Sequence, residues 1–194
     1  MNLSKLFKTK KTVFRSKEIG TILGLDNDNY LKVVLKRAKE KGEIKNISKG
    51  LYALTEDYSL FELANKFKSP SYISLETVLQ REGLIFQDYS GAVFSVSNNF
   101  IVKNIKDIKF RYFKIKDQVL SNMVGIKRIN GYLIASKERA LCDKLYLSSG
   151  FYFDNLEEID WEKVFEIMKI YNNKRLINEI LALKNSLNIK NKNA

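Results

Sequence analysis

Two amphipathic segments separated by a short turn constrain the fold of this chain more than any other feature. Ser16 begins the first segment, which reaches Gly24, a residue suited to the left-handed conformation that ends a helix. The second segment, residues 29–41, keeps its apolar side chains on one helical face. We expect Ser16 to cap the first helix and Asp26 or Asp28 to cap the second. The pattern therefore predicts two helices joined by a tight turn.

The flanking residues extend this pair into a larger unit. Leu3, Leu6 and Phe7 are spaced as on one helical face and predict a short first helix. Residues 44–47 and 51–54 have the composition of two short strands, and Ser48-Lys49-Gly50 forms the turn between them. The order helix, helix, turn, helix, hairpin is typical of a winged helix-turn-helix. We therefore predict a winged helix-turn-helix DNA-binding domain over residues 1–55.

Positive charge is concentrated in the same region. The chain has a formal net charge of +12, and residues 1–55 hold 11 Lys and 2 Arg against 5 acidic residues. Two thirds of the excess therefore lies in this first quarter. A lysine-rich composition alone could reflect an AT-rich genome, but it would not place the excess at one end. A localised basic region is the footprint expected of a nucleic-acid binder.

The face of segment 29–41 opposite its apolar stripe has the chemistry of base recognition. Asn29 could pair with an adenine, Lys32 and Lys36 could reach guanine or phosphate, and Val33 could contact a thymine methyl group. The alternative is that this is an ordinary charged helix surface. The residues predicted to contact DNA, including wing residues, are Lys17, Asn29, Tyr30, Lys32, Val33, Lys36, Arg37, Lys45 and Lys49.

The composition excludes several catalytic classes. The chain has no histidine and one cysteine, Cys142, which rules out His-ligated zinc, Ser-His catalysis and an intrachain disulfide. None of its glycines lies in a phosphate-binding loop motif. We therefore expect no catalytic residues, no metal site, no cofactor and no enzymatic activity. Without a long apolar run or a recognisable signal peptide, the protein is expected to be cytoplasmic.

Residues 56–194 are expected to form a mixed α+β domain, so that the whole chain belongs to the α+β class. Cys142 is interpreted as a core residue, and Arg139 with Asp143, spaced i, i+4, as a helix-surface ion pair. Phe110, Tyr112 and Phe113 could stack on bases, but strand packing is the favoured interpretation. The predicted helices are 60–67, 72–81, 136–147, one from Asp160 and one over 176–187, and the predicted strands are 93–96, 110–115 and 132–134.

Three segments in order resemble the AbiE-type antitoxins, the AbiEi-like regulators of bacterial type IV toxin–antitoxin systems. They are GLYAL at 50–54, YISLETVLQREGL at 72–84 and IASKERALCDKLY at 134–146. Together with the N-terminal winged helix, the resemblance covers residues 5–150. Their order and spacing are more specific than any one segment, because winged helices alone are common.

The resemblance implies a function that composition cannot show. Such antitoxins repress their own operon by binding inverted repeats in its promoter, and they oppose a nucleotidyltransferase-like toxin without a stable mutual complex. The DNA-reading role would transfer to residues 29–41 and 45–49, and no catalytic residue is carried over. Two alternatives stay open: a winged-helix regulator of unrelated genes, and a protein that sequesters a toxin through Phe and Tyr surfaces of its second domain.

Overall fold

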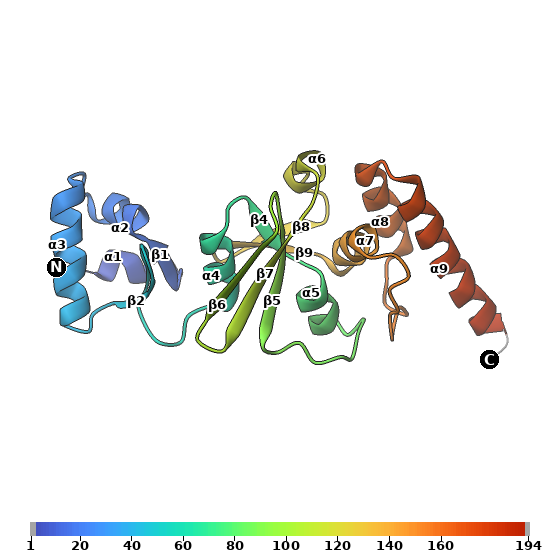
Figure 1. Ribbon diagram of the computed structural model, residues 1–194, viewed down its shortest axis with the longest axis horizontal. Coiled ribbons are helices and arrows are strands. Elements are labelled where there is room, and N and C mark those ends of the chain that lie inside the picture. Colours follow the sequence, from blue (N-terminus) through green and yellow to red (C-terminus); the bar gives the residue numbers. More distant parts are fainter. Residues whose placement is uncertain (1–2, 193–194) are drawn as a thin grey trace. The chain divides into compact units, whose positions relative to one another are not determined.

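The computed structural model describes residues 3–192 and has a mixed α+β architecture (Figure 1). The chain divides into two compact units. The first contains residues 3–69 together with Ile129–Tyr132, and the second contains Pro70–Arg128 and residues 133–192. The predicted α+β fold class is confirmed.

The N-terminal unit has the elements of a winged helix-turn-helix followed by one further helix. Its three strands form an antiparallel sheet in the order β1-β3-β2. The strand β1 was not predicted, because its three residues give little periodicity and it exists only through pairing with β3. The elements are α1 (Ser4–Phe7), β1 (Val13–Arg15), α2 (Ser16–Leu23), α3 (Asp28–Glu40), β2 (Lys45–Ser48), β3 (Leu51–Ala53) and α4 (Leu60–Phe67).

The helix-turn-helix is held by close packing between α2 and α3. Gly24 ends α2 in the left-handed conformation, with φ of 70°, and the backbone N–H of Leu25 donates to the Gly20 carbonyl at 2.8 Å. Leu31 and Leu35 of α3 are buried in the core against α2. A Cβ atom at Gly20 would lie 3.0 Å from Leu31 Cδ2, so only glycine fits without displacement.

The helix caps differ from those predicted. Asn27, and not Asp26 or Asp28, caps α3. Its side-chain oxygen accepts hydrogen bonds from the backbone N–H groups of Asn29 and Tyr30, at 3.0 Å each. Ser16 is the first residue of α2 and not its cap; its hydroxyl donates to the Gly50 carbonyl at 3.3 Å. The side chain that fits best at a cap depends on where the backbone turns, which sequence alone leaves open by a residue or two.

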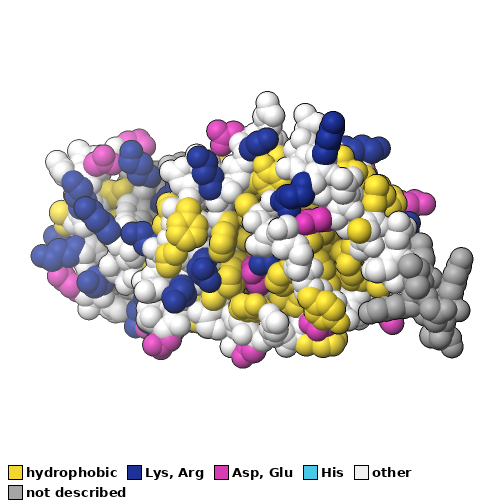
Figure 2. Space-filling view, turned by 45° about the vertical axis from the view of Figure 1, so that its right-hand side comes forward, with side chains coloured by type: hydrophobic (Ala, Val, Ile, Leu, Met, Phe, Trp, Pro, Cys, Tyr) yellow, Lys and Arg dark blue, Asp and Glu magenta, His cyan; other side chains and the backbone are white. Residues whose placement is uncertain are grey.

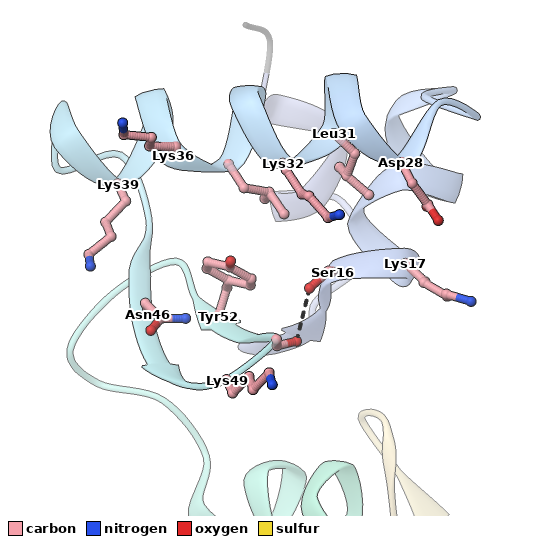
Figure 3. Close-up of a pocket in the computed structure, with 12 residues that line it drawn as sticks. Ser16, Lys17, Asp28, Leu31, Lys32, Lys36, Lys39, Asn46, Lys49 and Tyr52 are labelled. Atoms are coloured by element: carbon pink, nitrogen blue, oxygen red, sulfur yellow. Dashed lines mark hydrogen bonds between the residues drawn. The ribbon is translucent and has the colours of Figure 1, made fainter.

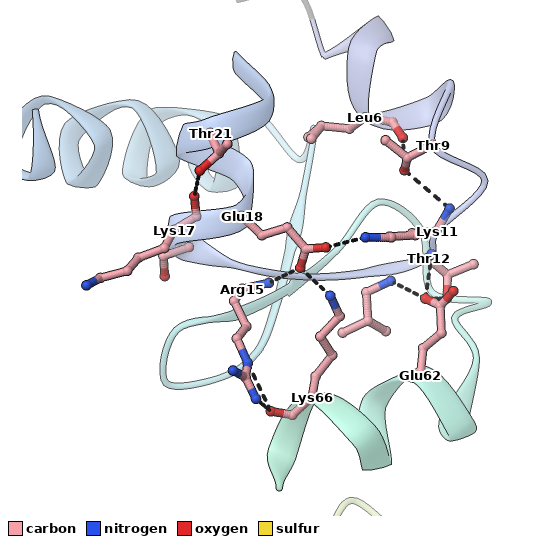
Figure 4. Close-up of polar contacts among 12 residues, drawn as sticks. Leu6, Thr9, Lys11, Thr12, Arg15, Lys17, Glu18, Thr21, Glu62 and Lys66 are labelled. Atoms are coloured by element: carbon pink, nitrogen blue, oxygen red, sulfur yellow. Dashed lines mark hydrogen bonds and ion pairs between the residues drawn. The ribbon is translucent and has the colours of Figure 1, made fainter. Parts of the chain in front are cut away.

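The helix α4 belongs to the N-terminal unit, which continues past residue 55. The Glu62 carboxylate is buried and accepts hydrogen bonds from the Thr12 amide, the Thr12 hydroxyl and the Val13 amide at 2.7–2.8 Å. Glu18 of α2 pairs with Lys11, at 2.6 Å, and with Lys66 of α4 (Figure 4). These contacts join α4 to β1 and α2.

The second unit is built on a mixed sheet of six strands in the order β6-β7-β5-β4-β9-β8. The strands β5 and β7 are parallel, as are β4 and β9, whereas β6–β7 and β4–β5 are antiparallel. Its elements are β4 (Ser71–Ile73), α5 (Glu76–Arg81), β5 (Ala92–Ser97), β6 (Ile101–Ile105), β7 (Ile108–Lys114), α6 (Asp117–Ser121), β8 (Ile126–Ile129), β9 (Tyr132–Ala135), α7 (Lys137–Leu147), α8 (Trp161–Met168), the 3-10 turn η1 (Lys169–Tyr171) and α9 (Lys174–Lys192).

Several predictions for this unit are confirmed and others are wrong. The strands expected at 93–96, 110–115 and 132–134 are present as β5, β7 and β9. Phe110 and Tyr112 are fully buried, as core packing predicted. The helix expected over 72–81 is wrong in its first part, because Tyr72 and Ile73 pair with β5 in a strand. The strands β6 and β8 and the helix α6 were not predicted.

Arg139 and Asp143 form a buried ion pair, so the prediction of a surface pair is wrong. Both side chains are fully buried, with Arg139 Nε 3.5 Å from Asp143 Oδ1. The hydroxyls of Tyr72, Ser74 and Tyr171 donate to the Asp143 carboxylate at 2.6–3.0 Å. The two residues therefore connect β4, α7 and η1 in the core. Cys142 is also buried, as predicted.

Replacing Gly20 should destabilise the N-terminal unit. We expect Gly20→Val to lower the free energy of unfolding by about 1–3 kcal/mol, because its side chain would overpack the contact with Leu31. Urea unfolding followed by circular dichroism measures this change. Thr21→Val is the matched control, since Thr21 is the next residue of α2 and is exposed. Equal stability of the two variants would contradict close packing between Gly20 and Leu31.

The Glu18 carboxylate should make stability depend on pH in the acid range. Burial alone would raise its pKa, but hydrogen bonds from Lys11 and Lys66 lower the pKa below the usual 4.5. A lowered folded-state pKa gives stabilisation that is present above pH 4.5 and is lost as the pH falls further. The difference in unfolding free energy between the wild type and Glu18→Gln should therefore shrink on acidification from pH 6 to pH 3. A constant difference would contradict this assignment.

Candidate nucleic-acid interface

A groove of about 550 Å³ lies between α3 and the β2–β3 hairpin, which we call the wing (Figure 3). Five lysines and one carboxylate line it, so it is strongly positive. The apolar floor comes from the inner side of α3. The lining residues are Ser16, Lys17, Asp28, Leu31, Lys32, Leu35, Lys36, Lys39, Asn46, Lys49, Gly50 and Tyr52.

The rotation of α3 places its lysines at this groove. Burial of Leu31, Leu35 and Ala38 fixes the inner face of the helix. At 100° per residue, Lys32 and Lys39 then lie on the side towards the wing. In Figure 3 the ammonium group of Lys39 is directed towards the wing, whereas that of Lys36 lies on the outer side of the helix.

The wing is held in place by backbone contacts. The strands β2 and β3 shift register between Asn46 and Ser48, and the side-chain Nδ2 of Asn46 spans this irregularity by donating to the Ser48 carbonyl at 2.9 Å. The backbone N–H of Ser16 donates to the Gly50 carbonyl at 3.0 Å, which fixes the wing tip to the start of α2. The groove therefore has walls of regular structure on both sides.

Four of the nine predicted residues line this groove, namely Lys17, Lys32, Lys36 and Lys49, although the ammonium group of Lys36 lies on the outer side of α3 (Figure 3). Asn29 and Val33 are exposed on α3, as predicted, but do not line the groove. Helical geometry places both on the outer face of α3, near Lys36.

The remaining three predicted residues lie elsewhere. Tyr30 and Arg37 line a second depression of about 380 Å³ on the other side of α3, together with Lys5 and Lys41. Lys45 pairs with Glu56 at 3.2 Å and is not among the residues that line the groove.

Sequence reasoning missed part of the groove. Lys39 was not among the predicted contacts, although its spacing of seven residues from Lys32 places it on the same helical face, two turns away. Asn46 and Tyr52, which are register partners on the wing, were not predicted. Neither carries a local signal, because their position depends on how the wing folds against α3.

The positive potential of the groove is little reduced by acidic residues. Glu40 lies 3.9 Å from Lys36, but both side chains are largely exposed, and such a pair contributes little. Asp28 lies in the first turn of α3, where the helix dipole favours a carboxylate. Dark blue Lys and Arg side chains crowd the left-hand part of the surface, over the N-terminal unit (Figure 2).

Other kinds of site find little support in residues 3–192. Within this range no three His, Cys, Asp or Glu side chains are grouped so as to hold a metal ion. Burial raises the pKa of the Cys142 thiol well above its usual value, so the thiolate is not available as a nucleophile. No helix among these residues is long and apolar enough to cross a membrane.

No family model matches the chain, and no curated protein matches it.

Proposed function

We propose that this protein binds double-stranded DNA through α3 and the wing, and that it is a transcriptional regulator and not an enzyme. One observation supports this most directly: lysines from α2, α3 and the wing tip line a single groove. The outer face of α3 is exposed at the same time, so the helix can approach a partner. An ordinary solvated helix surface would not require a second positive element opposite it.

The dimensions of α3 suit the major groove. Its thirteen residues rise about 1.5 Å each and give a rod of roughly 20 Å. The major groove of B-DNA, about 12 Å wide, admits such a helix. Asn29, Val33 and Lys36 would then face base edges, where an amide can pair with adenine and an ammonium group with guanine.

The wing and the start of α2 would contact the DNA backbone. Lys49 lies at the wing tip and Lys17 in the first turn of α2, and both are exposed. Contacts of this kind fix the register of a protein on the duplex but carry no sequence information. Base readout would come from α3 alone.

We further propose that the protein represses its own promoter as the antitoxin of a type IV toxin–antitoxin system. The resemblance to AbiE-type antitoxins supports this step. The DNA target would be inverted repeats in that promoter. The second partner would be a nucleotidyltransferase-like toxin, opposed without a stable complex. A regulator of unrelated genes would bind other promoters, and a sequestering protein would co-purify with its toxin.

Footprinting on the DNA upstream of the gene tests the proposal. We expect a protected region with inverted repeats and an affinity that falls steeply with salt. Four to six phosphate contacts give a slope of log affinity against log salt of about −4 to −5. The footprint is measured together with titrations at two or more salt concentrations. Binding that does not depend on salt would contradict DNA binding by lysine contacts to phosphates. Protection of no upstream site would contradict repression of the protein's own promoter.

Lys36→Ala should weaken operator binding. We expect a loss of roughly 1–3 kcal/mol if the side chain reads a base. Lys174→Ala is the matched control, since it removes the same charge from an exposed position at the start of α9 in the second unit. Fluorescence anisotropy with the footprinted duplex measures both affinities. Equal losses for the two variants would remove Lys36 from the readout face.

A further inference from the structure

One sheet face of the second unit is exposed at the edge strand β6 and partly exposed at β7, whereas Phe94 and Val96 of β5 on the same face are buried. Phe100, just before β6, is 59% exposed, and Val102 within β6 is 42% exposed. Val102 pairs with Arg111 of β7, which in turn pairs with Phe94 of β5. Because paired residues project to the same side of a sheet, these side chains share one face. The three strands lie side by side in Figure 1.

Aromatic rings and a guanidinium group are arranged together on this face. The rings of Phe94 and Phe113 are stacked at 6.3 Å with an interplanar angle of 13°. Arg111 Cζ lies 5.5 Å from the Phe94 ring centre and 5.4 Å from that of Phe113. Phe100 contacts Phe113 edge to face at 5.7 Å. Arg111 therefore packs on Phe94 and Phe113, and the exposed Phe100 ring lies against Phe113 on the same face.

The charge of this face is positive. Strand alternation and register place two cations here, Arg111 and the exposed Lys109, and no acidic residue. The residues that the three strands contribute to this face are Ala92, Phe94, Val96, Val102, Asn104, Lys109, Arg111 and Phe113. An anionic partner with flat apolar groups complements this combination.

We propose that this face binds single-stranded nucleic acid. Phe100 stacks on a base, while Arg111 and Lys109 contact phosphates. A single strand fits because its bases are free to stack on a protein ring, whereas those of a duplex are stacked on one another. The site is separate from α3 and the wing, and it does not depend on the duplex-binding proposal.

A second copy of the chain fits this face less well. Antiparallel pairing of two β6 edges about their centre would place Lys103 opposite Lys103. Like charges directly opposite each other destabilise such a pair, and lysine is typical of sheet edges that avoid pairing. Charge therefore favours an anionic partner.

Binding of a labelled 12-nucleotide oligouridine to the full chain tests this site. We expect Phe100→Ala to weaken binding roughly 5- to 100-fold, the effect of losing one stacked base. Phe100→Trp should retain binding, because the larger ring also stacks. Tyr152→Ala is the matched control: Tyr152 is 72% exposed and lies outside the three strands. Fluorescence anisotropy measures the affinities, and thermal melting checks that each variant is folded.

Three outcomes would overturn the proposal. The first is no binding of the oligouridine by the wild type at low salt. The second is the same affinity for Phe100→Ala and Tyr152→Ala, which would show that the Phe100 ring makes no specific stacking contact. The third is loss of a co-purifying protein in Phe100→Ala with oligouridine binding unchanged, which would indicate a protein partner. Lys36→Ala, measured alongside, should affect only duplex binding, so the two proposals can fail separately.

Discussion

The candidate interface depends on the burial of one narrow apolar stripe along α3. Leu31, Leu35 and Ala38 are each less than 5% exposed, and their packing fixes the rotation of the helix about its axis. The absence of a side chain at Gly20 lets α2 approach the same stripe closely. Once this rotation is set, the lysines of α3 can only lie at the groove or on the outer face. The charge distribution is thus a consequence of core packing.

Local patterns predicted much of the N-terminal unit because its helices are short, periodic and close in sequence. The turn at Gly24, the helices α2 and α3 and the hairpin follow from neighbouring residues. The groove could not be predicted in the same way. Asn46 and Tyr52 enter it only through the pairing of β2 with β3, and Tyr30 leaves it because α3 turns that residue to the other side. Such placement depends on contacts between segments.

The buried pair in the second unit illustrates the same limit. A spacing of four residues correctly placed Arg139 and Asp143 side by side on α7. It could not show that the pair is enclosed, because the enclosing hydroxyls come from Tyr72, Ser74 and Tyr171, far away in sequence. An unpaired buried charge would be costly, and these donors compensate the carboxylate. Burial is therefore a property of the tertiary fold that helix periodicity does not contain.

The hydrogen bonds of Glu62 determine how this chain can be divided. Its carboxylate accepts three hydrogen bonds, from the Thr12 amide, the Thr12 hydroxyl and the Val13 amide, at the edge of the small sheet. Without Glu62 these donors would lose their acceptor. A fragment cut at residue 55 would contain every element of a winged helix and still lack this acceptor. The smallest N-terminal fragment that keeps this acceptor therefore extends through α4, and it would still lack Ile129–Tyr132, which belong to the same compact unit.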